Sequence, residues 1–286
     1  MIVRPRPTGL VLLYAMRGSV LPVIAPRLLL VAALSAAAVL LQHVRPGWFT
    51  EVNPAPFTLL GLGVSIFLGF RNSACYDRWW EGRKQWGALF SISRSLLRDV
   101  VVLLPEAGGV RRHAALLVPE FARALRDQLR APVPMPPNRS GEALRQLAEA
   151  FAAQMRAGQI SDIIYRLFSD HLDGMTSIQT ACERLRNTPM PFAYSLMLHR
   201  SVWLICLLLP FGMVDTLGMA TPLLTLVLAY AFLGLDALGE ELEEPFTTAL
   251  NGLPLDGLVR NIEIAAAEAL GDAPPEPLTP KEYVLL

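Results

Sequence analysis

The chain has 286 residues, of which 53% are hydrophobic and 17% are charged, whereas soluble domains carry about 25% charged residues. A formal net charge of zero provides no field that would attract nucleic acid. Three cysteines without a Cys-x-x-Cys spacing (Cys75, Cys182 and Cys206) and four scattered histidines argue against a disulfide framework, a zinc site or any other metal cofactor.

Four apolar segments approach the length of about 20 residues that a helix needs to cross a bilayer. They occupy residues 28–48, 52–70, 201–214 and 216–235, and the second is 19 residues long without a charge. Only Asp215 separates the last two, which predicts a helical hairpin. The sequence therefore predicts an all-α membrane protein with four transmembrane helices. A soluble protein with buried helices is the alternative.

Basic residues are concentrated on one side of these segments, which indicates the orientation of the chain. The N-terminal segment 1–27 and the stretch that follows residue 70 carry the following residues: Arg4, Arg6, Arg17, Arg27, Arg71, Arg78, Arg83, Lys84, Arg94 and Arg98. Since positive charge stays inside, both termini are expected in the cytoplasm, with the protein in the cell inner (plasma) membrane. Trp48 and Phe49 are then expected at the outer interface.

The region 71–200 is predicted to form a cytoplasmic helical domain, because amphipathic patterns recur in Ser91–Leu104, His113–Leu129 and Glu142–Met155. No proline follows Phe70 until residue 105, so one long helix is expected to leave the membrane. Further cytoplasmic helices are expected over 237–272. The proline-rich tail 273–286 is expected to be extended, either on a partner subunit or as a disordered end.

The third apolar segment contains Pro210 and Gly212, which predict a bend or a frayed end of its helix.

The second apolar segment carries a stripe of residues on one helix face. Leu62, Ile66 and Phe70 are spaced by four, and the stripe continues through Ser73, Asp77 and Glu81. In a single subunit such a stripe is ordinary packing. In a ring of identical subunits it would form apolar collars followed by acidic rings, an arrangement that suits a cation pore.

Several motifs in this sequence resemble those of the bestrophin family. They are Gly69-Phe70-Arg71-Asn72, Tyr76-Asp77-Arg78-Trp79-Trp80-Glu81, Trp86-Gly87, Arg184, Thr188-Pro189-Met190-Pro191-Phe192-Ala193-Tyr194, Leu198-His199-Arg200, Glu240-Glu241-Leu242-Glu243-Glu244-Pro245-Phe246, Asn251 and Leu253-Pro254-Leu255-Asp256. These blocks follow the family order over most of the chain. The blocks up to Gly87 look like the second-helix signature of the family, and the Thr-Pro block and the block that begins at Glu240 are similar to those of bacterial members.

The resemblance implies a homopentameric channel with one central pore that passes small monovalent ions across the lipid bilayer. It implies that Leu62, Ile66 and Phe70 form the pore neck, and that one apolar residue before the Thr-Pro motif, matched here to Ile178, forms a cytoplasmic aperture. Animal members conduct anions, and some bacterial members conduct cations. Asp77 and Glu81 favour a cation channel, for sodium or potassium, and a chloride channel of the same fold is the alternative.

The animal members bind calcium through an acidic cluster, and the matching stretch 247–252 contains no carboxylate. Calcium prefers several hard oxygen ligands, so animal-type calcium gating is not expected. A membrane enzyme that uses His199 with Glu240–Glu244 is a rival class, but the sequence lacks the hydrolase and phosphate-binding motifs. A secondary transporter and a structural membrane protein are two more rival classes.

Overall fold

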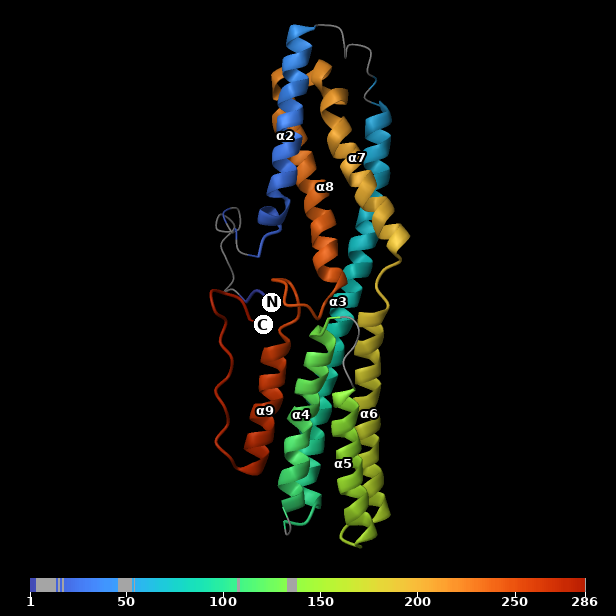
Figure 1. Cartoon of the computed structure of the whole chain (residues 1–286), viewed down its shortest axis with the longest axis vertical. Coiled ribbons are helices and arrows are strands. Elements are labelled where there is room, and N and C mark those ends of the chain that lie inside the picture. The colour runs from blue at the N-terminus through green and yellow to red at the C-terminus, as the bar shows by residue number, and fades with distance from the viewer. Residues whose placement is uncertain are drawn as a thin grey trace. The chain divides into compact units, whose positions relative to one another are not determined.

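The computed structural model describes residues 1–3, 14, 16, 18–45, 53, 55–106, 109–132 and 138–285. Regular structure in these residues is helical (Figure 1), apart from the isolated bridges Ile2↔Val284 and Lys281↔Val284. The expected interfacial residues Trp48 and Phe49, and the arginines at positions 4, 6 and 17, lie outside the described residues.

The chain divides into two compact units. The apolar unit contains Arg6–Arg78 and Pro189–Glu243, and the amphipathic unit contains Met1–Pro5, Trp79–Thr188 and Glu244–Leu286. The units therefore change at residues 78 and 188, whereas the predicted membrane boundaries lie at residues 70 and 200.

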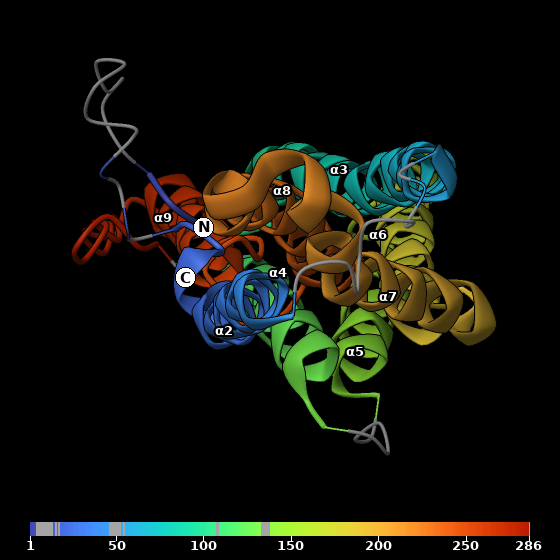
Figure 2. The same cartoon turned by 90° about the horizontal axis from the view of Figure 1, so that it is seen from above.

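The apolar unit consists of α2 (Leu21–Val44), the first half of α3 (Ala55–Leu103), α7 (Phe192–Leu217), the 3₁₀ turn η2 (Gly218–Ala220) and α8 (Thr221–Glu243). Among the described residues, three helical stretches are long and apolar enough to cross a membrane, and the third runs from Phe192 to Glu243. This stretch contains both α7 and α8, which pack against each other and against α2 (Figure 2). The reversal uses Gly218, whose φ of +50° favours glycine. The predicted hairpin is thereby confirmed.

Two helices of the apolar unit begin earlier than the apolar runs predict. Helix α2 begins at Leu21 and includes Arg27, because Pro22 stands in its first turn, where proline is tolerated. Helix α7 begins at Phe192, directly after Pro191, and includes His199 and Arg200. The expectation of a frayed end near Pro210 is wrong, since α7 continues to Leu217.

The amphipathic unit consists of the second half of α3 with α4 (Val110–Arg130), α5 (Arg139–Arg156), α6 (Asp162–Asn187) and α9 (Leu255–Leu270). Side-chain oxygens cap two of these helices: Asn138 accepts from the Gly141 amide at 2.7 Å, and Ser161 accepts from the Ile164 amide at 3.3 Å. The core includes the stacked rings of Phe151 and Phe168, 4.2 Å apart. These helices confirm the amphipathic pattern, and the 49-residue α3 confirms the long helix.

The Asp99 carboxylate in the amphipathic unit is expected to make the stability of the protein depend on pH. Asp99 is buried, and burial alone would raise its pKa, but hydrogen bonds from Arg98 at 2.9 Å and His171 at 3.0 Å lower the pKa below 3.8. A carboxylate whose pKa is lowered by folding stabilises the folded state at any pH above its unfolded-state pKa. This contribution is lost as the pH falls through the folded-state pKa. We expect Asp99→Asn to lower stability by about 1 kcal/mol at neutral pH. Thermal unfolding in detergent at several pH values should show this gap closing below about pH 4. A gap that persists at lower pH would contradict the assignment.

The tail after α9 has no regular structure over residues 273–280, and its residues are exposed except for a half-buried Pro275. The segment is held at both ends: Asp272 pairs with Arg112 at 2.8 Å, and the Leu285 amide donates to the Met1 carbonyl at 2.9 Å. The extended form is as predicted, and the partner subunit remains an expectation.

Candidate functional site

Helix α3 presents an apolar face that its own chain leaves uncovered. Leu62, Ile66 and Phe70, the predicted neck residues, are 59%, 50% and 64% exposed, and Ser73 and Asp77 on the same stripe are also exposed. Exposure in one protomer is a requirement for any side chain that lines a channel shared between protomers. The helix face that the residue spacing selects as a possible pore wall is therefore exposed in the protomer.

The opposite face of α3 is buried within the apolar unit. Covered side chains recur on this face at helical spacing, namely Val64, Leu68, Arg71 and Cys75. Val64 and Leu68 share a core cluster with residues of α7 such as Ile205. Phe70 and Arg71 are neighbours in sequence and lie on different sides of the helix. The orientation of the neck residues is thus coupled to the packing of the buried face.

A buried ion pair anchors this face to α8. The Arg71 guanidinium is 2.7 Å from the Asp236 carboxylate, and both side chains are 3% exposed or less. A second carboxylate, Glu243, lies 3.6 Å from Arg71 and accepts a hydrogen bond from the Met190 amide at 3.1 Å. The Arg78 Nε donates to the backbone carbonyl of Glu243 at 3.3 Å. Glu243, in the acidic block near residue 240, therefore pairs with a basic side chain of α3.

His199 completes this anchor from α7. Its Nδ1 lies 2.7 Å from the second oxygen of Asp236, and the Trp203 indole donates to its Nε2 at 3.1 Å. Because the indole N–H is only a donor, Nε2 must accept, so a neutral His199 carries its hydrogen on Nδ1 and donates it to Asp236. Asp236 therefore receives hydrogen bonds from both α3 and α7.

Some residues of this anchor could in principle bind a metal ion or take part in catalysis. His199, Asp236 and Glu240 offer ligand atoms that lie within 4.8 Å of one another. However, both ring nitrogens of His199 are engaged in hydrogen bonds, and Asp236 already neutralises Arg71. A divalent cation would have to displace these contacts, so the geometry favours a hydrogen-bonded anchor over a metal centre.

The two acidic residues of the stripe differ in their surroundings. Asp77, in the apolar unit, is exposed and has no hydrogen bond or ion pair with the rest of the described chain. Glu81, in the amphipathic unit, lies 2.6 Å from Lys84, and hydrogen bonds from Lys84 and Gln85 lower its pKa. Asp77 therefore presents a less compensated negative charge than Glu81.

Ile178, which the family resemblance matches to the aperture, is enclosed within its own protomer. This side chain is 4% exposed and belongs to the core of the amphipathic unit, on the buried face of α6. A side chain enclosed by its own protomer cannot line a shared channel. Ile163, in the first turn of α6, is 78% exposed, more than any other large apolar side chain described in this unit.

The residues near α9 do not fit a calcium site of the animal type. The segment 247–252 contributes no carboxylate and folds into turns, with the Gly252 amide donating to the Ala249 carbonyl at 2.9 Å. The nearby Asp256 has one oxygen 2.9 Å from Arg126 and the other 2.9 Å from Arg130. Both of its oxygens are thus engaged with guanidinium groups.

The sequence did not identify Asp236 as a residue of the site. In the sequence, Asp236 only marked the end of the fourth apolar segment. An ionisable residue at the edge of an apolar run is a signal for a buried partner. Arg71, which directly follows the second apolar segment, is another ionisable residue in such a position.

The chain is similar to a known family and to several known proteins. Residues 1–268 match the family described as bacterial/fungal bestrophin protein. The chain is 43% identical to "Voltage-dependent anion channel-forming protein mll4386" of Mesorhizobium japonicum, over 99% of this chain and 96% of that protein. It is 41% identical to "Voltage-dependent anion channel-forming protein YneE" of Escherichia coli K12, over 92% of each chain. It also resembles the crystal structure of a bacterial bestrophin homolog from Klebsiella pneumoniae, with a TM-score of 0.82 and 36% identity over 88% of this chain and 100% of that chain.

The long apolar helices and the family match together place the chain in a class of helical membrane channels. The chain belongs to the bacterial/fungal bestrophin family.

Proposed function

We propose that the protein is an ion channel of the bestrophin type, in which five copies surround one central pore and each copy crosses the plasma (inner) membrane four times with both termini in the cytoplasm. The observation that carries this proposal is the exposed apolar face of α3 opposite a buried, ion-paired face. A face of this composition is suited to line a narrow passage that a ring of helices encloses. Light scattering of the purified protein in detergent should give five chains, and a monomer would overturn the proposal.

Leu62, Ile66 and Phe70 would stack as three apolar collars in such a ring. A constriction lined by apolar side chains offers no replacement for the hydration of an ion, and it can close by losing its water. The collars therefore act as a barrier that sets the conductance, and the conducted species are small monovalent ions. The chain needs no catalytic group for this activity, and calcium gating is not part of the proposal.

Ion selectivity follows from the charges near the neck. Asp77 lies two helical turns beyond Phe70 on the same stripe, where five exposed carboxylates would concentrate cations. A cation-permeable channel for sodium or potassium is therefore our first candidate. An anion channel is the second candidate, because the relatives at 43% and 41% identity are named anion channel-forming proteins.

We propose Ile163 in place of Ile178 as the apolar residue of the cytoplasmic aperture. Ile163 stands in the first turn of α6, before the Thr188-Pro189 motif, as the family resemblance requires. Leu167 follows one turn later on the same exposed face, so this end of α6 can present an apolar ring.

Reversal potentials in a planar bilayer under a salt gradient distinguish the two selectivities. We expect the potential to follow the cation gradient, and Asp77→Asn to reduce the cation-to-anion permeability ratio by about fivefold, as removal of about 1 kcal/mol of charge interaction implies. Glu142→Gln, which removes an exposed carboxylate of α5 paired with Arg145, is the control and should leave the ratio unchanged. A potential that follows chloride would exclude the cation channel and support the anion channel.

A further inference from the structure

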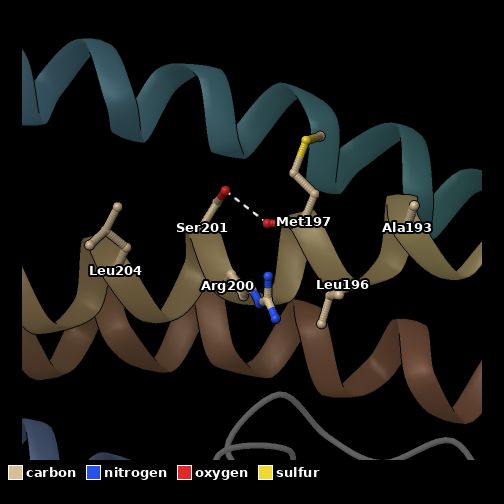
Figure 3. A pocket seen from close by; sticks show the side chains of 6 residues that line it. All are labelled: Ala193, Leu196, Met197, Arg200, Ser201 and Leu204. Atoms are coloured by element: carbon tan, nitrogen blue, oxygen red, sulfur yellow. Dashed lines mark hydrogen bonds between the residues drawn. The ribbon is translucent and has the colours of Figure 1, made fainter.

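One face of α7 forms a shallow groove with a volume of about 300 Å³ (Figure 3). The groove is lined by residues at helical spacing, namely Ala193, Leu196, Met197, Arg200, Ser201 and Leu204. This face is distinct from the His199 face, which is engaged with Asp236. The groove therefore belongs neither to the anchor nor to the exposed stripe of α3.

Arg200 is the only charged side chain of the groove, and it is exposed. It makes no ion pair or hydrogen bond with any residue that the structure describes. The hydroxyl of Ser201 is already engaged, because it donates to the Met197 carbonyl at 2.9 Å. The guanidinium is thus the one group in the groove with hydrogen-bond donors to offer to a ligand.

The position of Arg200 in the sequence indicates where the groove lies relative to the bilayer. It is the last charged residue before the uncharged run 201–214 of a membrane-crossing stretch. A guanidinium at the end of such a run belongs at the level of the lipid headgroups, since its burial among acyl chains is costly. Phosphate groups are concentrated at this level and match the fork of donors on arginine.

We propose that this groove binds the headgroup phosphate of an anionic phospholipid. Arg200 holds the phosphate through paired N–H donors, and the exposed Leu204, one turn further into the apolar run, contacts the upper part of an acyl chain. A volume of about 300 Å³ lies at the lower end of the range for ligand pockets, about 300–1,000 Å³, which suits a headgroup better than a complete lipid. The absence of an acidic side chain from the groove favours a net-negative lipid over a zwitterionic one.

This proposal requires only that the chain is inserted in a membrane, and it does not depend on ion conduction. The full chain should be purified in detergent, titrated with phosphatidylglycerol and examined by native mass spectrometry. We expect Arg200→Gln to weaken the retention of phosphatidylglycerol by about fivefold. Arg200→Lys, which keeps the charge but loses the forked geometry, should give an intermediate value.

Arg139→Gln is the matched control, because Arg139 is an exposed arginine of the amphipathic unit. It should retain as much lipid as the unchanged protein. Equal retention by Arg200→Gln and the unchanged protein would overturn the proposal. So would a loss of subunits in Arg200→Gln with unchanged lipid retention per chain, because the groove would then belong to a contact with a second copy.

Discussion

Alanine at Leu62, Ile66 and Phe70 together is expected to raise the single-channel conductance about tenfold, because this corresponds to lowering the barrier by about 1.4 kcal/mol. All three side chains are exposed in the protomer, so their truncation removes little buried contact area. The change widens the apolar constriction and allows water to remain in it. Planar bilayer recordings of the purified protein measure the effect directly.

The matched control replaces exposed apolar side chains on another helix of the same unit. Leu223→Ala with Val227→Ala on α8 removes comparable apolar surface, and it should leave the conductance unchanged. If the triple neck variant conducts like the unchanged protein, the exposed face of α3 does not form the limiting barrier. If the control also raises the conductance, the effect reflects loosened helix packing and gives no support to the neck.

The sequence predicted the elements of the fold because their signals are local. Uncharged runs located the apolar helices, and amphipathic spacing located the end of α3, α4 and α5. The orientation of α3 was also predictable, since its apolar stripe and its buried stripe have the same period on opposite sides. The start of α7 was not predictable, because the apolar run begins only after His199 and Arg200. The inclusion of these two residues in the helix depends on distant partners.

The sequence predicted which side chains of α3 share its exposed face, and it did not predict the contacts of the buried face. The neck residues follow from spacing within one helix, whereas the contact of Arg71 with Asp236 joins positions 165 residues apart. Helix α6 shows the same limit, because its apolar side chains are exposed near its start and buried further along. Ile178 and Ile163 both fit an apolar position before the Thr-Pro motif, and only the packing against α4 and α5 shows that Ile178 is enclosed.

The buried pair of Arg71 and Asp236 leads to the largest expected effect on stability. Asp236→Ala leaves the Arg71 guanidinium buried beside Glu243 alone, at 3.6 Å, and it also removes the acceptor of His199. Loss of one partner of a buried pair costs about 3–5 kcal/mol, because the remaining charge is uncompensated. We expect a marked decrease in the unfolding temperature of the detergent-purified protein, measured by thermal denaturation.

A double-mutant cycle separates the ion pair from simple loss of packing. Arg71→Met with Asp236→Leu replaces both charges by apolar side chains, and we expect it to be more stable than Asp236→Leu or Arg71→Met alone. The surface pair of Arg123 and Glu263 has the same separation, 2.7 Å, but Arg123 is half exposed. Arg123→Gln should therefore cost no more than about 1 kcal/mol.

The cycle also tests whether the anchor sets the orientation of the neck, since Phe70 precedes Arg71 on the same helix. If α3 is held by this pair, Arg71→Met should alter the conductance although it does not touch the exposed face. The double variant should differ from Arg71→Met in conductance, because its new apolar contact again packs α3 against α8. Single variants as stable as the unchanged protein, or effects that simply add in the double variant, would show that Arg71 and Asp236 are neighbours without mutual dependence.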